Sequence, residues 1–136
     1  MPKAIQIDKP GPASAMKWRE VTVGKPKKGE VRLRQTAVGL NYIDIYHRMG
    51  LYPMDMPLII GMEGAGVVEA MGAGVKDLKI GDRVAYASVP LGAYAEERLM
   101  PAARVVKVPK AIDDQTAATM MLQGMTQQLN QGATPP

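Results

Sequence analysis

Three side chains with neutral hydrogen-bonding groups lie within twelve residues of one another: Asn41, Tyr46 and Tyr52. An amide or a phenol beside an apolar surface can hydrogen-bond the oxygen of a flat carbonyl compound without bringing a charge into the site. A competing interpretation assigns Asn41 to helix capping and the tyrosines to packing at the edge of the core. Spacing alone favours that second interpretation.

Two ionisable residues of the same region have uncertain roles on sequence grounds. Glu63 stands in an apolar, glycine-flanked run, so its carboxylate must be paired or hydrogen-bonded, either as a buried structural anion or as part of a site. His47 is the single histidine, and the chain has no cysteine. A lone histidine is typical of a structural position. With one histidine and no cysteine, the sequence predicts neither a Ser-His-Asp set nor a metal site.

The paired glycines do not predict a nucleotide site. Gly64-x-Gly66 and Gly72-x-Gly74 each lack the third glycine of a dinucleotide-binding fingerprint. The apolar run after the first pair is also strand-like and does not open a helix. We therefore expect these glycines to occupy turns or β-bulges.

Alternating and β-branched runs predict a mainly β domain. Strands are expected over residues 4–8, 20–23, 30–38, 64–71, 83–87, 92–100 and 104–108. Many short strands at close intervals favour a barrel or a sandwich. A short helix is expected near 42–49, between Asn41 as cap and Gly50 as stop, and a C-terminal helix near 113–123 after Asp113.

Length and composition restrict the function classes. The 136 residues fit one domain, or one domain with a tail, and the net charge is +4. The only dense basic run, residues 25–28, lies in a predicted turn and has no interleaved aromatics, so no nucleic-acid binding is expected. The first residues do not form a signal peptide, and no apolar run is long enough to cross a membrane, which predicts a cytoplasmic protein without membrane attachment.

Several motifs, in register from about residue 3 to residue 126, resemble one family of enzymes. They are the segments 39–53, 61–68, 72–75, 81–86, 92–96 and 122–126. Together they resemble quinone oxidoreductases of the zeta-crystallin type, which belong to the medium-chain dehydrogenase/reductase superfamily. The resemblance implies a GroES-like β-barrel, in agreement with the strand pattern.

The resemblance also implies an activity and its residues. Members of this branch transfer hydride from NADPH to quinones or conjugated enones. The resemblance gives Asn41, Tyr46 and Tyr52 catalytic contacts with the substrate, and it gives Asn41, Tyr46 and Thr126 contacts with the cofactor. Asn41 and Met62 stand where zinc-dependent relatives have a cysteine and a histidine, so the resemblance implies a zinc-free site.

The resemblance stops after Thr126. We expect residues 1–126 to form the GroES-like substrate-side domain, residues 127–136 to be a disordered or non-family tail, and the Rossmann domain of the family to be absent. Without that domain, the chain alone is expected to be inactive. The alternatives are a stand-alone GroES-like module for binding or self-association through surface left uncovered, and, with weaker support, a co-chaperonin.

Overall fold

The computed structural model describes residues 2–118, and its strands form two antiparallel sheets. The smaller sheet has the order β2-β1-β4, with β1 at Lys3–Ile7, β2 at Lys17–Glu20 and β4 at Leu58–Ile59. The larger sheet has the order β7-β3-β5-β6-β8. Its strands are β3 (Glu30–Gly39), β5 (Glu63–Met71), β6 (Arg83–Ala87), β7 (Glu97–Pro101) and β8 (Val106–Lys107).

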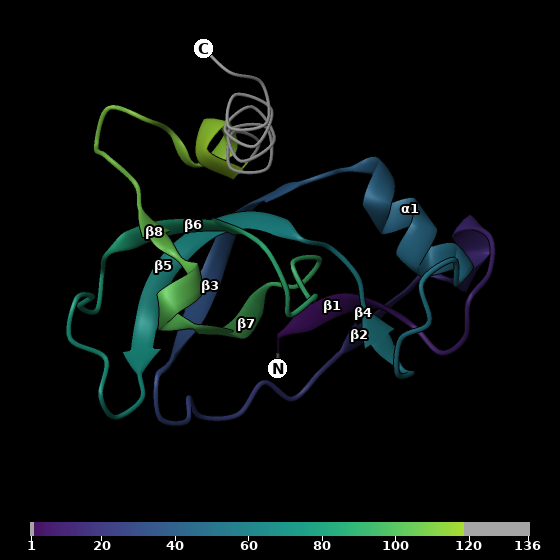
Figure 1. Ribbon diagram of the computed structural model, residues 1–136, viewed down its shortest axis with the longest axis horizontal. Coiled ribbons are helices and arrows are strands. Elements are labelled where there is room, and N and C mark those ends of the chain that lie inside the picture. Colours follow the sequence, from purple (N-terminus) through teal and green to yellow (C-terminus); the bar gives the residue numbers. More distant parts are fainter. Residues whose placement is uncertain (1, 119–136) are drawn as a thin grey trace, which may run out of the picture.

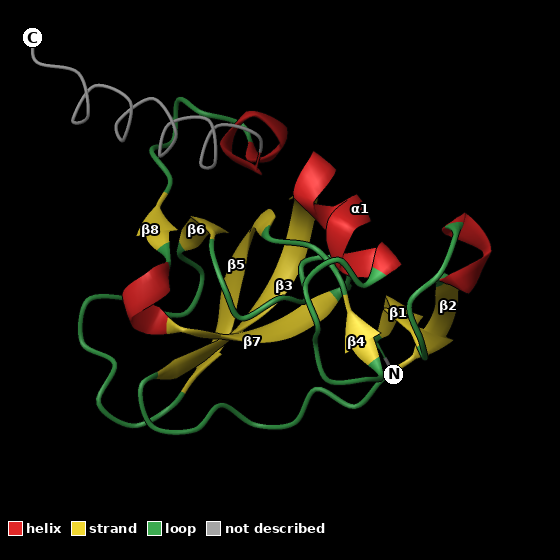
Figure 2. Cartoon of the chain, turned by 45° about the vertical axis from the view of Figure 1, so that its right-hand side comes forward, coloured by secondary structure: helices red, strands yellow, loops and turns green. Residues whose placement is uncertain are grey.

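The helices are short and lie at the ends of strands. Helix α1 spans Tyr42–Met49, and two 3-10 turns cover Ala13–Ala15 and Ala102–Arg104. Residues 114–118 are also helical. Figures 1 and 2 show α1 and residues 114–118 on the same side of the strands, with α1 directly following β3.

The main core cluster lies on one face of the larger sheet, and a smaller cluster contains Ala65, Ala85, Ala117 and Ala118. Successive side chains of a strand point to opposite faces, so the alternation in β3 buries Val31 and Leu33 together. They join a cluster that contains the fully buried Tyr86 and Met100. The sequence has no phenylalanine, and these two large side chains fill core volume in its place.

The glycines of β5 allow a close approach of neighbouring groups. A Cβ at Gly64 would lie 2.6 Å from the Tyr86 hydroxyl, and one at Gly66 would lie 2.7 Å from the Arg34 carbonyl oxygen. The β3–β5 register shifts between Gln35 and Ala37, which is an irregularity of the β-bulge type opposite these glycines. Gly64 and Gly66 therefore belong to a strand beside a bulge, which agrees with the bulge alternative of the expectation and not with a turn.

The side chain of Gln35 connects three parts of the fold. Its Nε2 donates to the carbonyl oxygens of Ala93 at 2.7 Å and Ala95 at 2.8 Å, and its Oε1 accepts from the Tyr86 hydroxyl. The Tyr86 ring also faces the Arg98 guanidinium, whose carbon lies 4.9 Å from the ring centroid. A part-buried polar group with several hydrogen bonds of this kind stabilises the fold only while its partners are in place.

The main sequence-based predictions of the fold are confirmed, with one correction. The mainly β class and the helix near 42–49 are present as predicted. The predicted helix 113–123 begins as expected, since Asp113 accepts a hydrogen bond from the backbone N–H of Thr116 at 2.6 Å. The part of this predicted helix beyond residue 118 lies outside the described residues. The described strands do not close into a barrel, because they form two separate sheets and the outer strands β7 and β8 of the larger sheet do not pair with each other.

Individual strand boundaries differ in four places. β2 covers Lys17–Glu20 where residues 20–23 were expected, since the ladder with β1 ends at the Lys3–Glu20 pair. β7 begins at Glu97 because residues 92–95 form an irregular segment held by Gln35. β8 is reduced to two residues, and the two-residue β4 was missed. The tail 127–136 and the boundary at residue 126 lie outside the described residues and stay predictions.

We predict that Gln35→Leu destabilises the chain by about 2–4 kcal/mol, because it leaves buried carbonyl groups and the Tyr86 hydroxyl without a partner. Urea unfolding followed by circular dichroism measures this change. The control is Gln6→Leu on β1, which removes one hydrogen bond from Arg19 near the surface and should change the free energy of unfolding by less than about 1 kcal/mol. Equal effects of the two substitutions would contradict the assigned role of Gln35.

Candidate functional site

Asn41 lies where β3 passes into α1, next to a buried carboxylate. Pairing of β3 with β5 places Gly39 opposite Glu63, two residues before Asn41. The Asn41 side-chain nitrogen donates to Glu63 Oε1 at 3.0 Å, and Glu63 is 2% exposed. The sequence left open whether Glu63 is a structural anion or a site residue, and the structure joins it directly to a predicted site residue.

A second buried carboxylate fixes the start of α1. Asp44 Oδ2 accepts from the backbone N–H of Asn41 at 3.1 Å and from the Tyr94 hydroxyl at 2.6 Å. Asn41 is the N-cap residue of a capping box with Asp44, so the capping interpretation is correct, and its side-chain nitrogen remains available to Glu63. Gly50 ends the helix with φ of 82°, as expected for a glycine after the last turn.

The two predicted tyrosines lie further along the same segment and are half-exposed. Tyr46 belongs to α1, and Tyr52 belongs to the loop that follows it. The ring of Tyr52 lies 5.8 Å from that of the buried His47, in a tilted arrangement. The contact of Tyr52 with the buried His47 agrees with packing at the edge of the core, and both tyrosines remain about half exposed.

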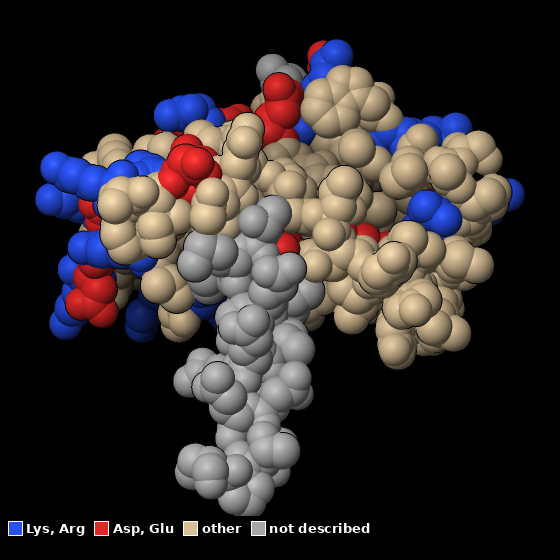
Figure 3. Space-filling view, turned by 90° about the horizontal axis from the view of Figure 1, so that it is seen from above, with Lys and Arg blue, Asp and Glu red and all other residues tan. Residues whose placement is uncertain are grey.

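The surface around α1 carries large uncharged side chains at high exposure. We call it the α1 apolar surface, and it consists of Leu40, Tyr42, Ile45, Tyr46, Met49, Leu51, Tyr52 and Met54. In Figure 3 the right-hand side of the molecule, over the region of α1, is mostly uncharged, whereas charged side chains gather at the left. Contiguous apolar patches of this kind mark ligand or protein contacts.

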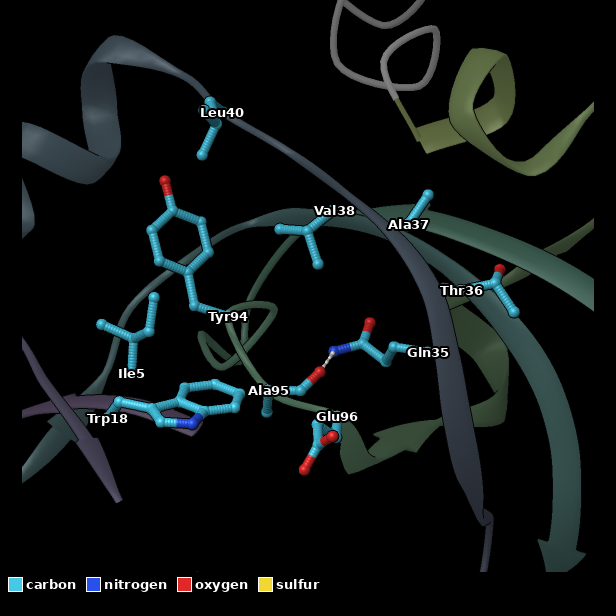
Figure 4. Close-up of a pocket in the computed structure, with 10 residues that line it drawn as sticks. All are labelled: Ile5, Trp18, Gln35, Thr36, Ala37, Val38, Leu40, Tyr94, Ala95 and Glu96. Atoms are coloured by element: carbon cyan, nitrogen blue, oxygen red, sulfur yellow. Dashed lines mark hydrogen bonds between the residues drawn. The ribbon is translucent and has the colours of Figure 1, made fainter. Parts of the chain in front are cut away.

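A hollow borders this surface at Leu40 but is not lined by the three predicted residues. It has a volume of about 430 Å³, and its walls include Ile5, Trp18, Val38, Leu40 and Tyr94. Figure 4 shows Trp18 and Tyr94 facing Val38 of β3 across it, with the Tyr94 hydroxyl directed away from Ala95. Tyr94 connects the hollow with α1 through Asp44.

Burial determines the protonation of Tyr94. Removal from water raises the pKa of its hydroxyl, and the adjacent Asp44 raises it further because a carboxylate stabilises the neutral phenol that donates to it. A neutral phenol is therefore the state that anchors α1.

No three residues of the metal-ligating types His, Cys, Asp and Glu come together within the part of the chain that the structure describes. The side chains of Asn41 and Met62, which the resemblance sets at the zinc-ligand positions of zinc-dependent relatives, are not strong zinc ligands. The expectation of a zinc-free site remains a prediction. Thr126, predicted as a cofactor contact, lies outside the described residues.

Comparison with known proteins identifies the fold family. Residues 27–110 match the alcohol dehydrogenase GroES-like domain. The chain belongs to this family. Within residues 2–118, no helix is long and apolar enough to cross a membrane.

Several of the relatives carry the names of reductases or oxidoreductases. The chain is 47% identical over 134 residues to the 2-haloacrylate reductase of a Burkholderia species, covering 94% of this chain and 40% of the relative. A crystal structure of quinone oxidoreductase from Pseudomonas syringae superposes with a TM-score of 0.96 at 41% identity, over 100% of this chain and 42% of the other. The Escherichia coli quinone oxidoreductase complexed with NADPH gives a TM-score of 0.89 at 38% identity, over 91% and 38%.

These relatives confirm the resemblance to quinone oxidoreductases that the sequence motifs suggested. The chain spans about 40% of the length of the curated relatives it matches.

Sequence reasoning missed the anchor between Asp44 and Tyr94. The spacing of Asn41 and Asp44 does carry a signal, since an acidic residue three positions after an N-cap is close to the capping-box pattern. Tyr94 lies fifty residues away from Asp44, and nothing in the sequence connects the two.

We predict that the chain loses stability as the pH rises above the ordinary tyrosine value of about 10. The folded-state pKa of Tyr94 is raised, so above pH 10 the unfolded chain ionises this tyrosine while the folded chain still holds it neutral, which favours unfolding. Urea unfolding at pH 8 and at pH 10.5 measures the effect. Tyr94→Phe should be less stable at pH 8 and less sensitive to the pH change, and an unchanged pH dependence in this variant would refute the assignment.

Proposed function

We propose that this chain supplies the substrate-side domain of an NADPH-dependent reductase of quinones or conjugated enones. The observation that carries the proposal is the Asn41 amide, held by Glu63 at the edge of an uncharged, exposed surface that also contains Tyr46 and Tyr52. Neutral donors on an apolar surface suit a planar carbonyl compound. The NADPH complex of the Escherichia coli relative supports the choice of cofactor.

NADPH would supply hydride to the acceptor, and a proton from solvent would complete the reduction. The role of this chain in the reaction is to orient the carbonyl group and to stabilise the negative charge that develops on the carbonyl oxygen. Preorganised donors aimed at that oxygen are effective because they need no rearrangement during the reaction. We assign this role to the amide of Asn41 and to the hydroxyls of Tyr46 and Tyr52, with Asn41, Tyr46 and Thr126 also on the cofactor side. We further propose that the reaction needs no zinc.

The described residues contain only antiparallel sheets, and a dinucleotide usually binds at the strand ends of a parallel sheet. We therefore predict that the 136-residue chain alone gives no NADPH oxidation with 1,4-naphthoquinone above the buffer rate. A chimera in which residues 1–126 replace the matching part of the Escherichia coli quinone oxidoreductase should give quinone-dependent oxidation. Turnover by the chain alone, or a folded chimera without activity, would each contradict the proposal.

In the same chimera, Asn41→Ala should lower kcat/KM by about 10–100-fold, since it removes one donor to the developing oxyanion. Initial rates with 1,4-naphthoquinone measure the loss. Gln6→Ala is the matched control, because it removes an amide from β1, away from α1, and should leave kcat/KM within about twofold. An equal loss in both variants would show that the Asn41 effect is not specific to the site.

The α1 apolar surface favours a second candidate function, a binding module that self-associates. Its eight large side chains include Leu40 at 79% and Tyr42 at 81% exposure, which is high for a monomeric protein. Under the reductase proposal, sedimentation velocity should give weak, concentration-dependent association without a fixed stoichiometry. Tyr42→Ser with Leu40→Ser should suppress it. A defined oligomer that persists on dilution would favour the module.

A further inference from the structure

We infer that Glu63 is a positioning residue that fixes the orientation of the Asn41 amide. The inference rests on the proposed function, in which Asn41 contacts the substrate and cofactor. An asparagine amide has two ends of nearly equal size, one that donates and one that accepts. Which end faces a ligand decides whether the site offers a donor or an acceptor to the carbonyl oxygen.

The contact itself selects the orientation. Asn41 Nδ2 donates to Glu63 Oε1 at 3.0 Å. An ionised carboxylate accepts hydrogen bonds and cannot donate one, so it attracts the nitrogen end of the amide and repels the oxygen end. The contact uses one hydrogen of Asn41 Nδ2, and the second hydrogen is not needed for it. At low dielectric, the carboxylate polarises the amide group that donates to it.

The position of Glu63 leaves its carboxylate little freedom. The residue is 2% exposed and forms the first residue of β5, where it pairs with Gly39 of β3. A Cβ on residue 39 would lie 2.3 Å from Glu63 Oε1 and 2.8 Å from the carbonyl oxygen of Ala118. Only glycine leaves room for the carboxylate at this point, so the backbone of both strands confines it.

The backbone of Asn41 is fixed from the other side. Its N–H donates to Asp44 Oδ2 at 3.1 Å, and the same oxygen accepts from the Tyr94 hydroxyl at 2.6 Å. One carboxylate therefore holds the main chain of Asn41 and another holds its side chain. The amide is left with a single orientation before any ligand arrives, which is the preorganisation that a neutral donor site requires.

A purely structural role of the Asn41–Glu63 contact predicts different effects of substitutions at Glu63. If Asn41 served only to satisfy the buried Glu63, loss of the carboxylate would change stability without affecting how Asn41 meets a ligand. If Glu63 positions the amide, a side chain of the same shape that keeps an acceptor oxygen should preserve the amide orientation. Glu63→Gln keeps that oxygen, and Glu63→Met removes it at similar volume.

Selective labelling makes Asn41 directly observable. Asn41 and Asn130 are the only asparagines of the sequence, so ¹⁵N-asparagine labelling of the 136-residue chain gives two side-chain amide pairs. In the wild type, one Nδ2 proton of Asn41 should lie downfield of the corresponding Asn130 proton because of its bond to the carboxylate. Glu63→Gln should retain most of this shift and Glu63→Met should abolish it. Glu69→Gln, a carboxylate change elsewhere on β5, should leave both pairs unchanged.

Titration with 1,4-naphthoquinone then measures how the substitutions at Glu63 change ligand binding. The chain has no cysteine, so no thiol can add to the quinone. The dissociation constant read from the Asn41 signal should rise about tenfold in Glu63→Met and stay within about twofold in Glu63→Gln. An Asn41 pair that does not respond to Glu63→Met, or that lies at the Asn130 position in the wild type, overturns the inference. A wild-type chain whose Asn41 pair shows the Glu63 signature but no quinone response counts against the proposed function instead.

If Glu63→Met fails to fold, the wild-type shift and the Glu63→Gln spectrum still decide the matter. A downfield Asn41 proton that keeps most of its shift in Glu63→Gln and all of it in Glu69→Gln supports the contact, and an Asn41 pair at the Asn130 position in the wild type refutes it.

Discussion

The antiparallel pairing of β3 with β5 determines where Glu63 lies relative to Asn41. Its last matched pair brings Gly39 against Glu63, and the missing side chain at Gly39 makes room for a carboxylate that the sheet would otherwise exclude. Burying a carboxylate costs free energy unless it is hydrogen-bonded, and the Asn41 amide supplies a bond to it. The Asn41–Glu63 pair is therefore held at the ends of two paired strands, whereas Tyr52 lies in the loop after α1.

Helix α1 is attached to this frame by polar contacts more than by apolar ones. Its buried residues are Asp44 and His47. Its exposed large side chains are Tyr42, Ile45, Tyr46 and Met49. A short helix would not be stable by itself in water, since helices of this length need tertiary contacts. The bond from Tyr94 to Asp44 provides such a contact across fifty residues of sequence. The inverted distribution, polar inside and apolar outside, suits a surface that meets another molecule.

The parts of the structure that were predictable depend on local patterns. The alternation in β3 and the cap and stop around α1 are properties of neighbouring residues, and both elements were located within one residue. Asn41, Tyr46 and Tyr52 came from the family resemblance, and the structure places them on one segment. Glu63 was noticed because a charge in an apolar run needs a partner, but the identity of that partner depends on strand register.

The parts that were not predictable depend on contacts between distant residues. The start of β7 is set by the side chain of Gln35, which holds residues 93 and 95 in an irregular segment although their sequence looks strand-like. The end of the β1–β2 ladder is set by where β1 begins, so the β-branched residues after Glu20 lie outside it. Neither the Tyr94–Asp44 bond nor the open edge of β3 beyond Arg34 has a local signature.

The register shift between Gln35 and Ala37 has a consequence for how the chain can vary in length. A strand that gains or loses one residue turns all later side chains to the opposite face. An insertion or deletion between Gln35 and Asn41 would therefore exchange the inward and outward positions and separate Asn41 from Glu63. The turns at residues 24–29 and 72–82 lie outside this stretch, so they can lengthen or shorten while the geometry around Asn41 stays the same.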